Sequence, residues 1–447
     1  MATGAYMRYP MSNFATPARF HATREAMATT LLAGPARLPR PLTTPAQLAR
    51  ALWRQLPPPA SGLQACVIIP AKDEAHHLPA TLAALAAQTE LDGAALPAHC
   101  LEVIVLANNC QDNTAAVVRQ LAQYYPGLTL HVAELQLPGE LAHVGQARRL
   151  LMDAAAQRLE ATTGRGGLIL STDADTLVAP DWLAACRAEI AAGAAAVGGR
   201  ILTRPGEPEL EELVALNPCS EPLERQALAV RRTQLRDATY HLLRNQLECL
   251  LDPCQHDPWP RHHQHFGASL ALTVAAYRQV GGLPVVRYLE DEALWQALCR
   301  HDLPVRHSPR VRVSTSARQQ GRVEVGLSWQ LREWAAHAQE QREPDVECPR
   351  QLAALWQARR ELRAYWQGHC QPTPAGFREW ALLLRVQAGA MYDKLHAAKS
   401  FGAFWEWVLG TRASAASAHS QSHVPLSEAV AWLRQAVRQG IAAGSRL

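Results

Sequence analysis

The sequence predicts an α/β protein in which an open, mostly parallel sheet is flanked by helices and a helical region follows toward the C-terminus. Two β-branched runs, 65–70 and 101–107, are each followed by polar turn residues and then by a stretch with helical periodicity. A third apolar run, 167–171, ends just before two carboxylates. Strands that alternate with helices form parallel units, and open sheets of such units bind ligands beyond the carboxyl ends of their strands.

Acidic or hydroxyl residues mark the helix starts between these strands. Asp73 and Glu74 precede the first apolar helical stretch, and Asp112 and Thr114 precede the second. Side chains of these types satisfy the free N–H groups of a first helical turn. Because each helix follows a strand, the polar turns of the strands are expected to meet at one edge of the sheet.

Asp173 and Asp175 are the leading candidates for chemistry. Strand side chains alternate between two faces, so residues two apart point the same way, and both carboxylates can reach one hard, oxygen-seeking cation. Such an ion usually serves a phosphate group. A second interpretation stays open, in which this segment and the Pro180-Asp181 turn after it form a solvated loop that caps the next helix.

Several segments together resemble the family 2 glycosyltransferases of the GT-A fold. They keep the order and rough spacing of that family across residues 63–335, and they are 67–74, 106–114, 171–175, 267–271, 281–282 and 289–294. The resemblance implies a GT-A type, open mixed or mostly parallel sheet and an enzyme of the hexosyltransferase type that uses a nucleotide-diphosphate sugar. Since one fold hosts many chemistries, the carboxylates at the expected strand ends carry the functional prediction.

The resemblance also implies roles for individual residues. It makes Asp291 the general base, with Glu290 as its neighbour, and it places Mn²⁺ or Mg²⁺ on the DXD motif of Asp173 and Asp175. His307 is a candidate third ligand of the ion. A divalent cation stabilises the negative charge that develops on a leaving diphosphate without any proton transfer. The acidic segment around Asp291 also suits the start of a helix, and the two interpretations are compatible.

The donor pocket implied by the resemblance draws on residues from several turns. These residues are Pro70, Glu74, Asn108, Asp112, Arg148, Asp173, Arg318 and Arg322. Asn108 stands where members often have an aspartate, and an amide donates as well as accepts hydrogen bonds, so the identity of the nucleobase stays open. Helix capping is an alternative role for Asp112, and a solvated basic loop is an alternative for Arg318 and Arg322.

Three functions are compatible with these residues. The segment after the Glu-Asp pair lacks the Gln-x-x-Arg-Trp motif of processive polysaccharide synthases, which predicts transfer of a single sugar. The favoured reaction, in glycan biosynthesis, is transfer with inversion to a hydroxyl of a small-molecule or lipid-like acceptor. The alternatives are a retaining transferase that resembles glucosyl-phosphoglycerate synthases and a catalytically degenerate protein that binds nucleotide sugars or glycans.

Composition favours a cytoplasmic enzyme with a sizeable core, because 48% of the 447 residues are hydrophobic. A formal net charge of +4 gives no indication of nucleic-acid binding, and ten cysteines without a framework pattern indicate reduced thiols. No apolar run approaches the roughly 18 residues of a membrane span, although a last helix at 426–441 leaves peripheral membrane contact or dimerisation open. The His- and Cys-rich stretch 249–265 fits no standard zinc-finger spacing. The oligomeric state stays open.

The composition divides the chain into three parts. Residues 1–60 predict an arm or linker, with a helix around 45–55. Residues 61–335 are the predicted transferase domain, in which 221–252 is a helical insertion that shapes the acceptor pocket. Residues 336–447 are helical and bear many tryptophans, whose rings are expected to pack against the helices rather than to stack on sugars.

Overall fold

The computed structural model describes most of the chain between Thr44 and Gln439. The described residues are 44–202, 222–316, 332–334, 336–337, 340, 342–416 and 423–439. Arg318 and Arg322, which the sequence predicts at the leaving diphosphate, lie outside the described residues.

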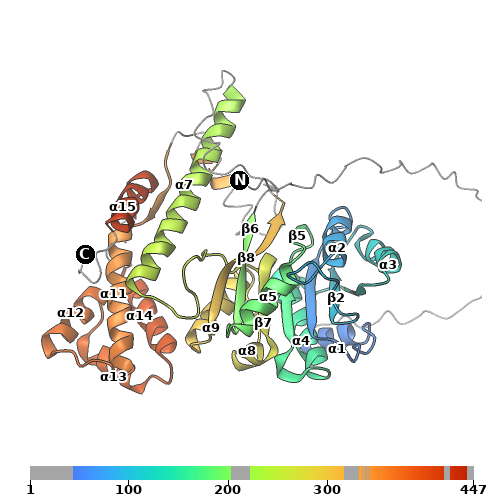
Figure 1. Cartoon of the computed structure of the whole chain (residues 1–447), viewed down its shortest axis with the longest axis horizontal. Coiled ribbons are helices and arrows are strands. Elements are labelled where there is room, and N and C mark those ends of the chain that lie inside the picture. Colours follow the sequence, from blue (N-terminus) through green and yellow to red (C-terminus); the bar gives the residue numbers. More distant parts are fainter. Residues whose placement is uncertain are drawn as a thin grey trace, which may run out of the picture. The chain divides into compact units, whose positions relative to one another are not determined.

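The central feature is a mixed sheet of eight strands in the order β3-β2-β1-β4-β7-β6-β8-β5 (Figure 1). The strands are β1 (Ala65–Ala71), β2 (Leu101–Asn108), β3 (Thr129–Leu135), β4 (Leu168–Ser171), β5 (Thr176–Val178), β6 (Ala196–Leu202), β7 (Leu270–Thr273) and β8 (Val305–Thr315). The first four strands in this order are parallel to one another. β7 runs antiparallel to both β4 and β6, β8 is parallel to β6, and β5 is antiparallel to β8. The prediction of an open, mixed or mostly parallel sheet flanked by helices is confirmed.

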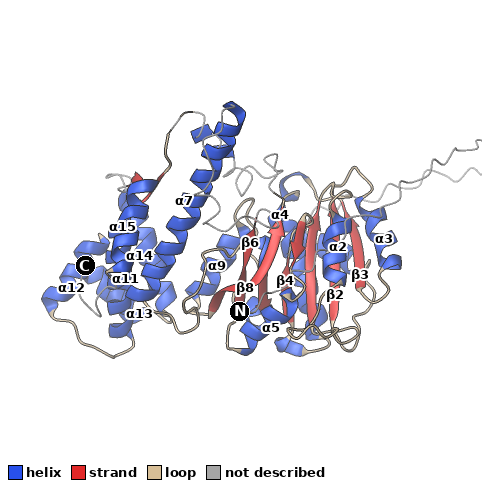
Figure 2. Ribbon diagram, turned by 45° about the horizontal axis from the view of Figure 1, so that its top comes forward, coloured by secondary structure: helices blue, strands red, loops and turns tan. Residues whose placement is uncertain are grey.

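Helices cover both faces of the sheet (Figure 2). One face packs against α1 (Pro45–Trp53), α4 (Val144–Glu160), α8 (Val274–Gln279) and α9 (Glu290–Arg300), and the other against α2 (Leu78–Ala86), α3 (Thr114–Tyr124) and α5 (Trp182–Ala191). Short 3₁₀ turns are η1 (Gly139–Leu141), η2 (Gly164–Gly166) and η3 (Gly267–Ser269). Side chains alternate along β1, so Ile68 joins the first core and Val67 joins the second.

The helix expected around 45–55 is present as α1. Thr44 caps it, because its hydroxyl accepts a hydrogen bond from the Gln47 backbone N–H at 3.3 Å and the Gln47 side chain accepts one from the Thr44 N–H at 3.1 Å. Leu48 and Leu52 are buried in the same core as β1. The end of the predicted arm therefore packs on the domain, since an amphipathic helix gains stability by burying its apolar face.

The C-terminal helical region is also present and has two cores of its own. It contains α11 (Pro349–Trp366), α12 (Pro374–Leu384), α13 (Ala388–Ala397), α14 (Phe401–Ala416) and α15 (Leu426–Arg438), with a two-stranded antiparallel sheet of β9 (Asp345–Glu347) and β10 (His423–Pro425), and α7 (Pro222–Leu251) packs on it. One core lies among α7, α11 and α15, and the other among α11, α12, α13 and α14. The predicted insertion at 221–252 is thus one long helix, and it packs on the C-terminal helices.

The apolar face of α15 packs within the chain. Leu426 and Leu433 of the last helix are buried against α7, so the face that left dimerisation or membrane contact open is covered. Trp356 is buried in the same core, and Trp405 stacks on Phe401 with ring centroids 6.3 Å apart. The described tryptophans of this region are packing residues, as expected. None of the described helices combines the length and the apolar character needed to cross a membrane.

α14 docks directly on α9, the helix that begins with the predicted catalytic pair. A Cβ added to Gly402 would lie 1.8 Å from the carbonyl oxygen of Cys299, so the two backbones touch. The Asp302 carboxylate accepts hydrogen bonds from the backbone N–H groups of Phe401 and Gly402, both at 2.7 Å. The C-terminal region is therefore tied to the element that carries Asp291.

Candidate active site

The turns after β1 and β2 are tied to each other through their backbones. The Asp73 carboxylate accepts a hydrogen bond from the Gln111 N–H at 2.6 Å, and Asp112 accepts one from the Ala75 N–H at 3.1 Å and one from the Thr114 N–H at 2.9 Å. Asp112 thus has the capping role that the sequence left open, because Thr114 begins α3.

Asp73, Cys110 and Asp112 also offer ligand atoms within 4.8 Å of one another. The two carboxylates already hold backbone N–H groups of these turns, so their contacts account for the cluster without an ion.

The predicted donor residues of these two turns lie at the same edge of the sheet. Glu74 is buried and contacts the His77 ring at 2.8 Å, and Pro70 is half-buried near the end of β1. Asn108 is the last residue of β2, and its side-chain amide makes no hydrogen bond with any described residue. The amide of Asn108 is therefore available to a ligand, and the nucleotide-binding roles of all three residues stay predictions.

Arg148 is at the centre of the carboxylate groups. It lies in the second turn of α4 with its side chain only 4% exposed, and its guanidinium donates to Asp173 at 2.7 Å and also to Glu290. Burial alone would lower the pKa of Arg148, but Glu290, Asp173 and Asp291 raise it. A Cβ on Gly267 would come within 2.3–2.5 Å of the guanidinium, so glycine is what allows this close approach.

Asp173 follows directly from the end of β4, which two hydroxyls fix to η3. Ser171 donates to the carbonyl oxygen of Gly267 at 2.8 Å, and Thr172 donates to that of Ala268 at 3.0 Å. Desolvation and the neighbouring carboxylates of Asp175, Glu290 and Asp291 raise the pKa of Asp173 to about 6, against the opposing charge of Arg148.

The carboxylate oxygens of Asp173 and Asp175 suit a divalent cation. Carboxylate oxygens are the ligands that Mg²⁺ and Mn²⁺ prefer, and a cation near Asp173 and Asp175 would offset the mutual repulsion of the carboxylates gathered there. Among the described residues these two aspartates do not form part of a three-ligand cluster. The metal and its ligands stay predictions.

The Asp291 carboxylate is held by two backbone donors. Its Oδ2 accepts a hydrogen bond from the Gly267 N–H at 2.8 Å, and its Oδ1 accepts one from the Glu292 N–H at 2.9 Å. Leu289, which precedes α9, has a left-handed backbone with φ of 57°, an uncommon conformation for a leucine. The orientation of Asp291 is therefore defined by the main chain of two segments.

His265 and Glu292 form a contact beside Asp291. The Nε2 of His265 lies 2.7 Å from Oε2 of Glu292, and the His265 ring stacks on Trp295 with centroids 4.6 Å apart. The hydrogen bond from His265 is the largest of the effects that lower the pKa of Glu292. We call the His265–Glu292 contact the clamp.

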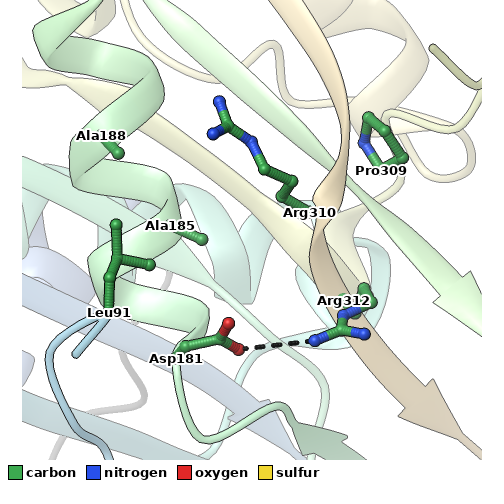
Figure 3. Close-up of a pocket in the computed structure, with 7 residues that line it drawn as sticks. All are labelled: Leu91, Asp181, Ala185, Ala188, Pro309, Arg310 and Arg312. Atoms are coloured by element: carbon green, nitrogen blue, oxygen red, sulfur yellow. Dashed lines mark ion pairs between the residues drawn. The ribbon is translucent and has the colours of Figure 1, made fainter. Parts of the chain in front are cut away.

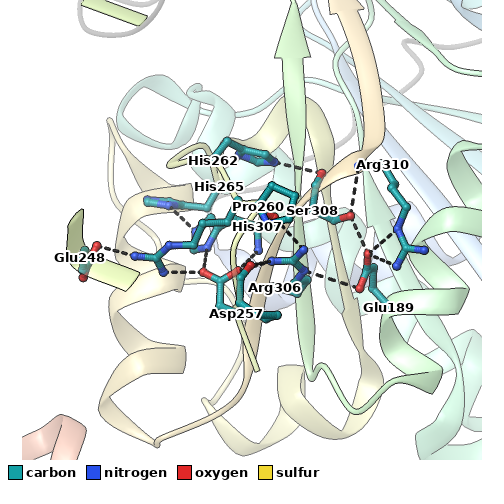
Figure 4. A network of polar contacts seen from close by, with 12 residues as sticks. Glu189, Glu248, Asp257, Pro260, His262, His265, Arg306, His307, Ser308 and Arg310 are labelled. Atoms are coloured by element: carbon teal, nitrogen blue, oxygen red, sulfur yellow. Dashed lines mark hydrogen bonds and ion pairs between the residues drawn. The ribbon is translucent and has the colours of Figure 1, made fainter. Parts of the chain in front are cut away.

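His307 lies next to His265 (Figure 4). Its Nε2 is 3.3 Å from Nδ1 of His265, and its Nδ1 is 2.8 Å from Oδ2 of Asp257. Both ring nitrogens of His307 thus contact protein groups, and its role as a third metal ligand stays a prediction. Three contacts join Asp257, His307, His265 and Glu292 in a row.

The network continues away from the site (Figure 4). Asp257 is 3% exposed and accepts hydrogen bonds from Arg261 at 2.7 Å and from Arg306 at 3.0 Å. Arg261 also donates to Glu248 of α7 at 2.5 Å. The sequence does not predict this network, because its partners are far apart in the chain. The only indication in the sequence is the His- and Cys-rich stretch 249–265, which contains Asp257 and Arg261.

A shallow pocket lies elsewhere, between α5 and β8 (Figure 3). Arg310 and Arg312 line it together with Asp181, which is 3.9 Å from Arg312. None of the predicted site residues within the described part of the chain lines this pocket. The carboxylates, not this hollow, mark the candidate active site.

Residues 66–244 match the family model described as "Glycosyl transferase family 2". No curated protein sequence matches the chain significantly.

Solved structures with a similar arrangement are only distantly related. The mannosyltransferase PcManGT from Pyrobaculum calidifontis, in complex with GDP-Man and Mn²⁺, has 18% identity and a TM-score of 0.40, over 89% of this chain and 88% of that chain. S. aureus TarS 1-349 has 13% identity and a TM-score of 0.35, over 85% and 92%. Glucosyl-3-phosphoglycerate synthase from Mycobacterium tuberculosis, in complex with Mn²⁺, UDP and phosphoglyceric acid, has 14% identity and a TM-score of 0.34, over 69% and 89%.

Proposed function

Because this chain carries a family 2 glycosyltransferase domain at residues 66–244, we propose that it transfers a single sugar from a nucleotide-diphosphate sugar to an acceptor hydroxyl with inversion. One observation carries the proposal: the Arg148 guanidinium contacts both Asp173 at the end of β4 and Glu290 at the start of α9. Asp173, proposed for the donor's diphosphate, and Glu290, proposed for the acceptor side, therefore contact the same buried guanidinium.

Asp291 is the proposed general base. Its two oxygens each accept one backbone hydrogen bond, which leaves further lone pairs for an acceptor hydroxyl. The carboxylate takes the hydroxyl proton as the acceptor oxygen bonds to the anomeric carbon of the sugar. The bond from that carbon to the diphosphate breaks on the opposite side, so the products are a nucleoside diphosphate and a glycoside of inverted configuration.

Asp173 and Asp175 are the proposed ligands of Mn²⁺ or Mg²⁺, with His307 as a further candidate. When bound, the ion supplies positive charge to the leaving diphosphate. Arg148 lies in the second turn of α4 and contacts Asp173 at 2.7 Å, so it holds one of the proposed ligands in orientation. The same guanidinium is suited to contact a phosphate oxygen, in keeping with its predicted role in donor binding.

Donor recognition is assigned to the turns after β1 and β2. The amide of Asn108 has no hydrogen-bonding partner among the described residues and stands at the carboxyl end of β2, where sheets of this type bind ligands. We assign it to the nucleobase, with Pro70, Glu74 and Asp112 lining the pocket. Arg318 and Arg322 are proposed to bind the diphosphate. The acceptor is proposed to be a small molecule or a lipid-like molecule.

The first test is a thermal-shift screen with nucleoside diphosphates and nucleotide sugars, with and without Mn²⁺ or Mg²⁺, because a ligand that binds only the folded state raises the melting temperature. A metal-dependent shift selective for one base is expected, and it should be lost in Asp175→Ala. The matched control is Asp393→Ala, which removes an exposed carboxylate on α13. No shift with any nucleotide in a folded sample would overturn the proposal.

The second test is the configuration of the product, read by NMR from the anomeric proton. Inversion relative to the donor is expected. Retention of configuration would instead assign the chain to the retaining alternative, in which Asp291 positions the acceptor. Nucleotide-sugar binding without turnover would favour the catalytically degenerate alternative.

A further inference from the structure

We infer that the C-terminal helical region holds the Asp291 carboxylate in place through a continuous chain of buried and half-buried ion pairs and hydrogen bonds, in which His265, Glu292 and Arg261 are positioning residues. This inference rests on the proposed function, since it concerns the base of that reaction. It gives the C-terminal helices a role that no family comparison supplies, because the matched family model ends at residue 244.

Two backbone N–H groups hold the Asp291 carboxylate. One is the N–H of Gly267, in the segment before β7, and the other is the N–H of Glu292, in the first turn of α9. His265 lies two residues before Gly267, and its Nε2 is 2.7 Å from the Glu292 carboxylate. The clamp therefore joins the two segments whose N–H groups hold Asp291, and a change in the clamp changes the spacing of those donors.

A row of buried and half-buried side chains supports the clamp on the His307 side. His307 contacts His265 at 3.3 Å and Asp257 at 2.8 Å. The carboxylate of Asp257 also binds Arg261 at 2.7 Å, and Arg261 binds Glu248 at 2.5 Å. Asp257 is 3% exposed, so losing one of its partners leaves a buried charge without compensation.

α11 completes the row. Arg359 donates to Glu248 at 2.7 Å and also to Asp252, so one guanidinium of the C-terminal region contacts a carboxylate of α7 and the carboxylate of the residue that follows α7. The row therefore runs from α11 through α7 and the segment before β7 to the first turn of α9. The opposite end of α9 is held by α14 at Gly402, so the helix that carries Asp291 is fixed by the same region at both ends.

Arg359 and Arg363 provide a matched pair for the test. Arg363 also lies on α11 and donates to Asp252 at 2.8 Å and 3.0 Å, but the structure gives it no contact with Glu248 among the described residues. Arg359→Met thus interrupts the row, whereas Arg363→Met removes an ion pair of similar burial beside it. With the proposed donor, Arg359→Met should lower kcat roughly tenfold, because a small misplacement of a reacting group is costly. The KM for the donor should stay unchanged, and Arg363→Met should stay within about twofold of the unaltered protein.

A double-mutant cycle tests whether Arg359→Met lowers kcat by disturbing the clamp. In a Glu292→Gln background the clamp is already weakened, so Arg359→Met should add little to the loss in kcat. Independent losses that simply multiply would overturn the inference. Arg359→Lys, which keeps the charge, should recover part of kcat, and it serves in place of Arg359→Met if that variant does not fold.

Hydrogen–deuterium exchange separates this inference from the proposed function, because it requires no turnover. Peptides covering Gly267 and Glu292 should exchange faster in Arg359→Met than in Arg363→Met. Faster exchange in a protein that transfers no sugar would overturn the proposed function and leave the coupling standing. Equal exchange and equal kcat in the two variants of an active enzyme would overturn the inference and leave the proposed function standing.

Discussion

The donor side and the acceptor side of the candidate site are built differently. On the donor side, the turns after β1 and β2 hold each other. Asp73 and Asp112 each accept a hydrogen bond from a backbone N–H group of the other turn. On the acceptor side, the segment that orients Asp291 is held by side chains from α9, β8, α7 and α11. Adjacent strands and their turns suffice for the first, whereas the second needs elements from the whole domain.

This difference predicts where substitutions will act. The donor side should tolerate changes elsewhere in the chain, because its hydrogen bonds close within two adjacent turns. The acceptor side should respond to changes far from Asp291, because each buried charge in its network depends on the next one. Substitutions on the two sides should therefore differ in their effects on donor binding, sugar transfer and stability.

The largest effect is expected from Asp291→Asn. An amide is a far weaker base than a carboxylate, and its NH₂ group cannot accept the hydrogen bond that Gly267 or Glu292 donates. Turnover should fall by roughly 10²–10⁴, while the thermal shift with the nucleotide stays as in the unaltered protein. Steady-state kinetics and thermal shift measure the two. Turnover close to that of the Asp393→Asn control would contradict the role of Asp291.

Gly267→Ala should affect both sides, because it crowds Arg148. The new Cβ would lie 2.3–2.5 Å from the guanidinium, which Asp173 and Glu290 hold in place. Crowding of this kind costs about 1–3 kcal/mol in the free energy of unfolding. Urea unfolding measures the cost, and Gly139→Ala is the control, since nothing lies within 4 Å of its Cβ. An equal effect at both positions would mean that Arg148 moves away without loss.

Asn108→Ala should act on the donor alone. Loss of one hydrogen bond to a nucleobase is expected to raise the KM for the donor several-fold, up to about tenfold, with little change in kcat. The free energy of unfolding should hardly change, because the amide has no partner among the described residues. A large loss of stability with an unchanged KM would assign Asn108 to the fold instead of to the nucleobase.

The smallest effect concerns acid stability on the acceptor side. Burial and the neighbouring His307 lower the pKa of His262 to about 3, from an unfolded value of 6.5. Below pH 6.5 the unfolded chain therefore binds a proton that the folded one does not, and the free energy of unfolding falls as the pH drops toward 3. Stability from this group is complete above pH 6.5.

His262→Gln should weaken that pH dependence. Glutamine can still donate to the Ser308 carbonyl oxygen and accept from the Gln264 N–H, as His262 does at 3.1 Å and 3.0 Å. Urea unfolding at pH 7 and pH 5 should give a smaller difference in the variant. The dependence that remains is expected from His241, whose pKa burial lowers to about 4, and from His263, whose pKa burial also lowers. An identical difference in both proteins would refute the assignment.

Much of the donor side could be predicted from the sequence because it is local. A β-branched run followed by polar turn residues marks the end of a strand, so the positions of Asn108 and Asp173 at one edge followed from the order of the runs. The acceptor side could not be assembled in this way. Glu290 pairs with Arg148 across 142 residues, and Arg359 pairs with Glu248 across 111, and no periodic pattern encodes such pairs. α1 was predicted as a helix, but its packing on the sheet depends on partners that lie far along the chain.

The backbone contact between Gly402 and Cys299 determines how the protein responds to truncation and to proteolysis. A boundary at residue 335, which composition suggested, would discard α14 and uncover the surface of α9 against which it lies. A protease cut between β8 and α11 should leave two fragments that travel together through gel filtration, because α7 and α9 belong to the first fragment and remain bonded to the second. A shortened chain that ends at this boundary is therefore expected to be a poor substitute for the whole protein.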